Sequence, residues 1–326
     1  MTKIFYSGIG IIDACPETIL GERSRIMLSY FRSVKRPEKR LEALADGTNP
    51  RPCEHFMDSG AFSLWVKSKS GYEFFRSVEF RGYLEGYVEF INRYRDVVDL
   101  YANADVLPGR FSERDKAEEL SLRNQKWLER RGLKPVPVVH LGADVSWLDQ
   151  YLDMGHDLIS LGGLVGSITK DGCRRWIAGC FDWASAKGVR LHGFGLTNFR
   201  AITSFPWYSV DSAVWDRVSS YGGLLIPRLR REEYVFDEEP FIVRVSNQNP
   251  SVRSGDGYHY LSLPRGQQEV IDRWLEEAGG YKVPQLESDH KARRVVNLHY
   301  FDRFQEWLLR REGTATTISQ GFRLVG

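Results

Sequence analysis

Short apolar runs alternate with longer helical patterns along most of the chain. The following runs have the length and the flanking turn residues of buried strands: Lys3–Tyr6, His55–Met57, Asp99–Ala102, Val136–Val139, Leu158–Leu161, Val189–His192 and Trp207–Val210. Leu224–Ile226 is predicted as the eighth strand. Apolar residues recur at the spacing of helices in the stretches between them: Tyr83–Arg95, Ser112–Arg131, Val145–Met154, Lys170–Lys187 and Asn198–Ser204.

This alternation of strand and helix predicts an α/β protein with a parallel sheet. About eight strands within about 230 residues fit a (β/α)8 TIM-type barrel, which usually has about 250 residues. A doubly wound open sheet is the alternative. No G-x-G-x-x-G motif follows the first strand, which argues against a dinucleotide-binding form of that alternative. We therefore predict a catalytic barrel over residues 1–232.

The remaining segment, residues 233–326, has a different character. Glu232–Pro240 is acidic, and Asn247–Gly257 is rich in Asn, Ser, Gly and Pro, which is typical of irregular structure. Two helical patterns with Trp and Leu on one face follow, Gln267–Ala278 and Asn297–Arg311. We expect an irregular insertion followed by C-terminal helices that close or cap the barrel.

The composition excludes several classes of protein. The chain has 45 Lys and Arg residues against 43 Asp and Glu residues, so its net charge is +2, and 42% of its residues are hydrophobic. This balance excludes a disordered chain and a strongly basic tail. No apolar run approaches the roughly 20 residues of a membrane span, and the first residues lack the pattern of a signal peptide. We expect a cytoplasmic protein without membrane contact.

The four cysteines, Cys15, Cys53, Cys173 and Cys180, are too sparse for a disulfide scaffold. Cys173 and Cys180 are separated by six residues, more than the two to four of a common zinc knuckle. Cys53 and His55 have no second pair of ligands nearby. We expect four reduced thiols, no metal and no cofactor.

Polar residues and glycines stand where predicted strands end: Asp58, Asp105, His140, Gly162, Gly163, Gly195 and Asp211. In a barrel all carboxyl ends of the strands open on one face, where active sites are built, so we expect these residues to converge. Two carboxylates there suit general acid–base or covalent glycosyl chemistry, in which one attacks an anomeric carbon while the other transfers a proton.

Other residues near the same strand ends suit the binding of a planar ligand. A third carboxylate, Asp105, is suited to the N–H edge of a base or sugar. Gly162 and Gly163 allow backbone amides to approach a planar ligand closely, and Phe62 and Phe194 are suited to stacking on its faces. Each residue alone also fits a structural role, as a turn residue, a satisfied histidine or a core aromatic. Their common placement favours the functional interpretation.

The order of short motifs between about residues 55 and 215 resembles that of the queuine tRNA-ribosyltransferases, also called tRNA-guanine transglycosylases. The segment 57–63 (MDSGAFS) resembles their Asp-Ser-Gly-Gly-aromatic-Gln segment, and Asn103-Ala104-Asp105 resembles the segment of their base-reading Asp. Further similar segments are 139–142 (VHLG, in the place of their Gln-Gly-Gly), 160–164 (SLGGL, their Gly-Gly-Leu), 192–195 (HGFG, their Met-Gly-Val-Gly turn) and 209–212 (SVDS, the segment of their nucleophilic Asp).

Two departures point to one branch of these enzymes. The Cys-x-Cys-x-x-Cys…His zinc site of the tRNA enzymes is absent, and no RNA-binding module follows the barrel. The chain is more similar to the DNA-modifying relatives of phages and some bacterial islands, which exchange guanine in DNA for a 7-deazaguanine. The resemblance implies a zinc-free barrel pentosyltransferase whose partners are guanine-containing DNA and a 7-deazaguanine base. A phage-encoded enzyme of this kind works in the host-cell cytoplasm.

The resemblance also implies roles for individual residues. Asp211 would attack C1′ of a deoxyguanosine and form a covalent glycosyl-enzyme, and Asp58 would act as the general acid and base. Asp105 would accept hydrogen bonds from the base N1–H and exocyclic amine, while His140 and the Gly163 amide would contact the O6 side. Phe62 and Phe194 would sandwich the base. The other motif residues implied to bind it are Ser59, Asn103, Gly162, Leu164 and Gly195.

A guanine inside a duplex is stacked, so such an enzyme must flip the base out or act on a single strand. Arg228, Arg230 and Arg231, just beyond the last predicted strand, are the predicted phosphate contacts. The alternatives are the same chemistry on tRNA, a non-catalytic nucleic-acid-binding barrel, and a carbohydrate-active hydrolase that uses Asp58 and Asp211. The inserted 7-deazaguanine, the target sequence and the oligomeric state are left open.

Overall fold

The structure is a computed structural model, and side chains are described as far as residue 311. It describes residues 2–8, 25–33, 41, 42, 45, 54–67, 71–109, 113–165, 171–248 and 258–322.

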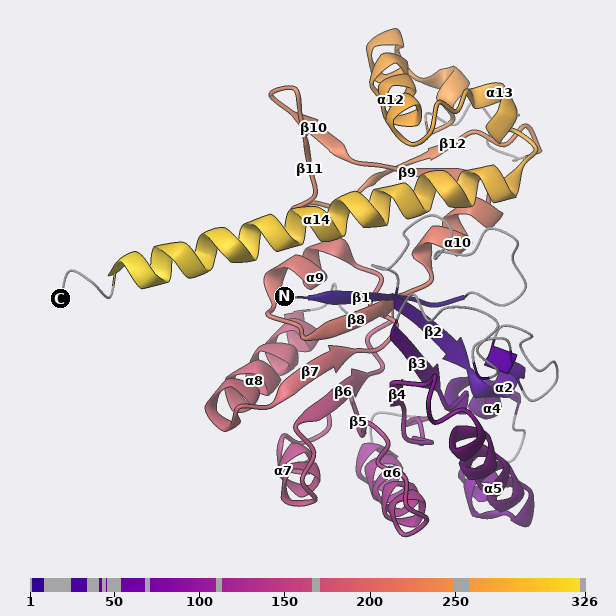
Figure 1. The fold of residues 1–326 in the computed structure, drawn as a ribbon, viewed down its shortest axis with the longest axis vertical. Helices are drawn as coiled ribbons and strands as arrows, with labels where there is room; N and C mark the ends of the chain where they lie inside the picture. Colours follow the sequence, from indigo (N-terminus) through magenta and orange to yellow (C-terminus); the bar gives the residue numbers. More distant parts are fainter. Residues whose placement is uncertain are drawn as a thin grey trace.

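Eight parallel strands form one curled sheet in the order β4-β3-β2-β1-β8-β7-β6-β5 (Figure 1). Their bounds are β1 Lys3–Tyr6, β2 Arg25–Ser29, β3 Glu54–Asp58, β4 Leu100–Tyr101, β5 Val138–His140, β6 Leu158–Gly162, β7 Arg190–Gly193 and β8 Ser209–Ser212. Each neighbour in the sheet is also a neighbour in the sequence, apart from β1 and β8, so the sheet winds in one direction around a common interior.

The edge strands of the curled sheet, β4 and β5, also follow each other in the sequence. A single parallel bridge joins Ala102 and Val136, which flank these two strands. The Val136 N–H donates to the Tyr101 carbonyl at 2.8 Å, and the Asn103 N–H donates to the Val136 carbonyl at 2.9 Å. The structure therefore shows an eight-stranded parallel sheet curled into a half-barrel, without the continuous ladder between β4 and β5 that would close it.

One strand was assigned wrongly to the parallel sheet by the sequence pattern. Leu224–Ile226 belongs to β9 (Gly223–Ile226), which lies outside the curled sheet and pairs antiparallel with β12 (Phe241–Arg244). The missing member is β2, whose apolar run Ile26-Met27-Leu28 is followed by Ser29 and directly by Tyr30 and Phe31 of α2, so no Gly, Asn or Asp marks the end of the strand. Its place depends on pairing with β1 and β3, and a local pattern does not record such distant contacts.

Helices cover the outer side of the sheet (Figure 1). The predicted helical stretches are confirmed with small shifts of their ends, and Ser77 and Asn198 cap two of them by accepting the backbone N–H of Phe80 and Ala201. The helices in this part of the chain are α2 Tyr30–Ser33, α4 Ala61–Lys67, α5 Val78–Arg93, α6 Arg114–Glu129, α7 Ser146–Asp153, α8 Asp171–Lys187, α9 Phe199–Ser204 and α10 Val214–Ser220, with the 3-10 helix η2 Gly71–Arg76.

An apolar cluster fills the interior of the curled sheet. It is formed by side chains from successive strands and from the bridge between β4 and β5: Phe5, Met27, Phe56, Ala102, Val136 and Leu158. Below it, Glu54 pairs with Lys3 at 2.7 Å and with Arg25 at 2.8 Å, at the amino ends of β1, β2 and β3. Because this end of the interior is filled, space for a ligand is left only toward the carboxyl ends of the strands.

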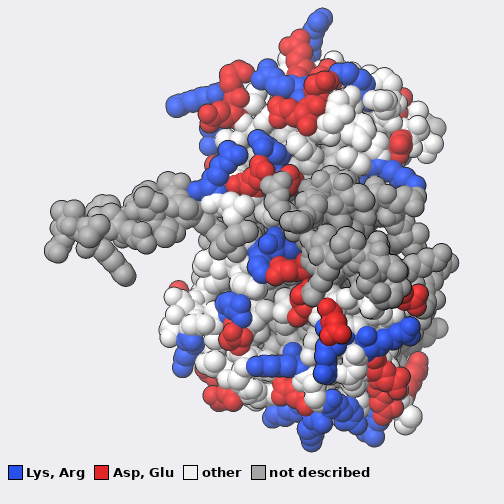
Figure 2. All heavy atoms as spheres, viewed as in Figure 1, with Lys and Arg blue, Asp and Glu red and all other residues white. Residues whose placement is uncertain are grey.

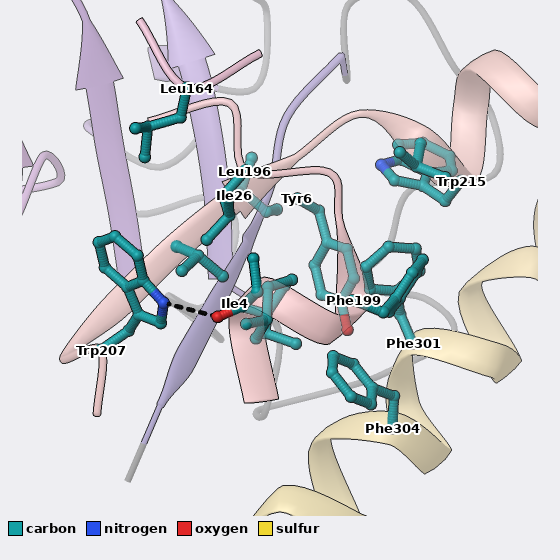
Figure 3. Packing of buried hydrophobic residues seen from close by; sticks show 14 of the residues in the cluster. Ile4, Tyr6, Ile26, Leu164, Leu196, Phe199, Trp207, Trp215, Phe301 and Phe304 are labelled. Carbon is teal, nitrogen blue, oxygen red and sulfur yellow. Dashed lines mark hydrogen bonds between the residues drawn. The ribbon is translucent and has the colours of Figure 1, made fainter. Parts of the chain in front are cut away.

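The C-terminal segment packs on the outside of the same sheet through α14 (His290–Phe322). Figure 3 shows Phe301 and Phe304 of α14 directed at Tyr6 and Phe199, and the rings of Phe301 and Tyr6 lie 5.9 Å apart. The other elements of this segment are β10 Arg228–Arg230, β11 Glu233–Val235, η4 Tyr260–Ser262, α12 Arg265–Glu277 and α13 Val283–Leu286. None of the helices in the described part of the chain has both the length and the apolar character needed to cross a bilayer.

Candidate active site

A cavity of about 440 Å³ opens at the carboxyl ends of the parallel strands. Every strand of the curled sheet contributes a lining residue from its end or from the loop that follows it: Ser7, Ser29, Asp58, Asp105, His140, Gly162, Gly195 and Asp211. This volume lies within the range of small-molecule sites in proteins. The apolar cluster beneath closes the cavity toward the other end of the strands.

The cavity brings together most of the site residues predicted from the sequence. Those that line it are Asp58, Phe62, Asp105, His140, Gly162, Gly163, Phe194, Gly195 and Asp211. Ser59, Asn103 and Leu164 are buried beside it and do not line it. Asn103 Nδ2 donates to the Ser121 carbonyl at 2.9 Å, and Ser59 Oγ accepts the Ala61 N–H at 3.4 Å, so these two groups bond within the scaffold.

The predicted phosphate contacts lie elsewhere, on β10 and the turn that follows it. Arg230 pairs with Asp237 at 3.3 Å and with Glu238 at 3.0 Å. Arg228 donates to the Glu239 carbonyl at 3.2 Å. Figure 2 shows acidic and basic side chains interspersed on this face, including the region where Figure 1 places the β10–β11 hairpin. The neighbouring carboxylates therefore offset much of the positive charge of this hairpin.

Asp211 is held by one of its two carboxylate oxygens. Its side chain is buried, and Oδ1 accepts the Gly195 N–H at 2.6 Å. Gly195 has a φ of 60°, and a Cβ there would come within 2.8 Å of Val165, so the turn that presents this N–H requires glycine. The buried Nε2 of His192 lies 3.7 Å from the same oxygen. No described residue hydrogen-bonds Oδ2, which leaves that oxygen available to a ligand in the cavity.

His140 connects two carboxylates across the interior. Its Nε2 lies 2.9 Å from Asp105 Oδ2, and its Nδ1 lies 2.9 Å from Glu118 Oε1. Burial alone would lower the pKa of His140, but the negative charges of Glu118 and Asp105 raise it to about 10. His140 is therefore an imidazolium at neutral pH whose two N–H groups donate to these carboxylates. Both ring nitrogens of His140 are bound to carboxylates, so His140 influences a ligand in the cavity through its contact with Asp105.

Glu118 is the functional residue that the sequence analysis missed. It lies on α6, it is fully buried, and its Oε1 also accepts the backbone N–H of His140 at 2.9 Å. A signal was present, because Glu118 shares a helix face with Ala117, Ser121 and Gln125, which are buried as well. A carboxylate on the buried face of an amphipathic helix needs a cationic partner, and His140 is that partner.

Asp58 has the most perturbed carboxyl group of the cavity. Burial is the largest cause that raises its pKa, and the negative charges of Asp105 and Asp211 raise it further. Hydrogen bonds from the Gly60 N–H and from Ser29 act in the opposite direction, and the resulting pKa is about 7. A carboxyl group with this pKa both gives and takes a proton near neutral pH, which is what a general acid and base requires.

The raised pKa of Asp58 makes a prediction about stability. Between its ordinary value of 3.8 and about 7, the folded protein binds a proton at Asp58 that the unfolded chain has released, so stability falls as the pH rises through this window. We expect the free energy of unfolding of Asp58→Asn to exceed that of the wild type by roughly 2–4 kcal/mol at pH 8. At pH 4 we expect no such difference. Urea unfolding at both pH values measures the difference. If the free energy of unfolding changed with pH in the same way for both proteins, the raised pKa of Asp58 would be contradicted.

No group of three or more His, Cys, Asp or Glu side chains in the described ranges is arranged to hold a metal ion. Cys173 and Cys180 are buried free thiols on α8. Cys15 and Cys53 lie outside the described residues.

No model of a protein family matches the chain, and no curated protein matches it. The chemistry of the cavity is therefore inferred from its own geometry.

Proposed function

We propose that the protein is a base-exchange transglycosylase, which replaces guanine in DNA with a 7-deazaguanine through a covalent glycosyl-enzyme. We further propose that the curled sheet is a (β/α)8 barrel whose seam is the bridge between Ala102 and Val136. One observation carries the functional proposal. Three carboxylates share one cavity in three different environments: Asp211 with an available oxygen, Asp58 with a pKa of about 7, and Asp105 paired with an imidazolium.

These environments suit a double displacement. In the first step Asp211 Oδ2 forms a bond to C1′ of the nucleotide, the bond from C1′ to the base nitrogen breaks, and the departing guanine takes a proton from Asp58. In the second step Asp58 removes the ring N–H proton of the incoming 7-deazaguanine, whose nitrogen attacks C1′ and releases Asp211. Two displacements at one carbon retain its configuration. Asp58 begins and ends the cycle in the same protonation state.

Asp105 gives the proposed cavity its preference for guanine-like bases. Its Oδ2 lies 2.9 Å from Nε2 of the His140 imidazolium, and a carboxylate only accepts hydrogen bonds. The N1–H and exocyclic amine of guanine, and of a 7-deazaguanine, form a matching pair of donors. Adenine presents an acceptor at N1, which would face the carboxylate without a hydrogen bond, and such a mismatch discriminates strongly.

The aromatic residues of the cavity differ in their surroundings. Phe194 packs against His192, with ring centroids 4.7 Å apart, and against Phe56 at 5.6 Å, so its ring is fixed from below. Phe62 lines the same cavity but is 65% exposed. A base between them would rest on a rigid inner ring and be covered by an outer ring that can adjust to it.

Label exchange tests the proposal directly. The purified protein is incubated with radiolabelled guanine and, in separate reactions, with single-stranded DNA, duplex DNA and bulk tRNA. Label that enters DNA and not tRNA is the expected result, and it must be lost in Asp211→Ala. Label that enters tRNA alone would replace DNA with tRNA as the substrate. Absence of label from every nucleic acid, with turnover of a simple glycoside, would assign the cavity to a hydrolase.

A further inference from the structure

The edge of the cavity next to α2 and α4 carries exposed cations and aromatic rings. Arg32 of α2 and Phe62 of α4 both line the cavity and are both exposed. Lys67, also exposed, ends α4, and its Nζ lies 4.5 Å from the centre of the Phe31 ring. We call Phe31, Arg32, Phe62 and Lys67 the α2–α4 rim.

The two cations of the α2–α4 rim are not neutralised by carboxylates of the described residues. Neither Arg32 nor Lys67 makes a hydrogen bond or an ion pair with any described residue. Arg230 of the β10 hairpin, in contrast, has two carboxylate partners. Arg32 is also the only Lys or Arg among the described residues that line the cavity. Its charge is therefore available to an anion that enters there.

The charge of the cavity explains why such cations are needed. Asp58, Asp105 and Asp211 surround the place of the proposed reaction, and a phosphodiester chain brought to it meets their negative field. The positive charge of His140 does not offset this negative field at the surface, because both of its N–H groups are directed to carboxylates. A cation at the edge attracts the phosphates flanking the reacting nucleotide and offsets this repulsion.

We propose that the α2–α4 rim binds the single strand on either side of the reacting nucleotide. Arg32 and Lys67 contact its phosphodiester groups. Phe62 covers the reacting base with one face of its ring, and its outer, exposed face stacks on the next base of the strand. Exposed aromatic rings combined with exposed cations are the arrangement with which proteins bind single strands irrespective of sequence. This inference rests on the proposed function, and it specifies its substrate as a polynucleotide strand rather than a free nucleoside or a continuous duplex.

Binding measured without chemistry tests the α2–α4 rim. The probe is a fluorescein-labelled single-stranded DNA 15-mer with one central guanine, and anisotropy is recorded over a series of salt concentrations. We expect Arg32→Gln/Lys67→Gln to weaken binding about tenfold or more and to make the salt slope shallower by about 1.4, at about 0.7 for each phosphate contact. Phe62→Ala should weaken binding about tenfold with an unchanged slope, because stacking involves no counterion.

The matched control is Arg228→Gln/Arg230→Gln, which removes the same charge from the β10 hairpin. Unchanged binding by this control, with weaker binding by the rim variants, supports the inference. Loss of binding in the control alone, or no binding by the wild type, overturns it. Tighter binding of the corresponding duplex by the wild type overturns the single-strand assignment. Because these measurements need no turnover, strand binding by an inactive protein would contradict the transglycosylase and leave the rim assignment standing.

Discussion

Asp211→Asn is expected to abolish both base exchange and the covalent adduct between the protein and DNA. The amide keeps the size of the side chain and an oxygen that accepts the Gly195 N–H, so the turn should be preserved. It removes the negative charge and the nucleophilic oxygen that the cavity leaves available. Loss of a covalent nucleophile lowers turnover by several powers of ten, and we expect a decrease of at least about a thousandfold.

Denaturing gel electrophoresis with an end-labelled guanine-containing oligonucleotide measures the adduct, and label exchange measures turnover. Asp153→Asn is the matched control, because Asp153 is an exposed carboxylate on α7 outside the cavity. It should form the adduct at the wild-type level. An adduct that persists in Asp211→Asn would show that another group attacks the sugar, and the role proposed for Asp211 would then be wrong.

The strands that carry the site were predictable because each is a short apolar run that ends at a polar residue or glycine. His55–Met57 ends at Asp58, and Val136–Val139 ends at His140, and the structure places both residues at the carboxyl ends of strands that share the cavity. This inference needs only the local pattern and the rule that parallel strands point the same way. β2 was not predicted, because its apolar run continues through Ser29 into Tyr30 and Phe31 of α2 and no Gly, Asn or Asp marks its end.

The side-chain directions beyond the strand ends were harder to predict. Asn103 and Leu164 stand within two residues of Asp105 and Gly162, yet they turn into the scaffold, since the alternation of a strand no longer holds in a loop. Arg32 lies on α2, directly after β2, so a pattern that does not predict this strand does not place Arg32 at the cavity either. The partner of His140 is Glu118 of α6, which precedes it by 22 residues in the sequence, and only packing brings the two together.

The second prediction with a large expected effect concerns the buried charges around His140. His140→Leu removes the imidazolium and leaves Glu118 as a fully buried carboxylate without a cation. Breaking a buried pair in this way costs about 3–5 kcal/mol, because the remaining charge is neither hydrated nor compensated. We expect a decrease of this size in the free energy of unfolding at pH 8.

The double variant His140→Leu/Glu118→Leu separates a lost charge partner from a lost packing partner. It contains no uncompensated carboxylate at position 118, so it should be more stable than His140→Leu alone, although it departs further from the native sequence. The wild type should also lose stability between pH 6.5 and about 10, as the raised pKa of His140 is passed, and neither variant should show that loss. Strictly additive effects of the two substitutions would mean that Glu118 and His140 are not coupled through their charges, and the role proposed for this pair would then be wrong.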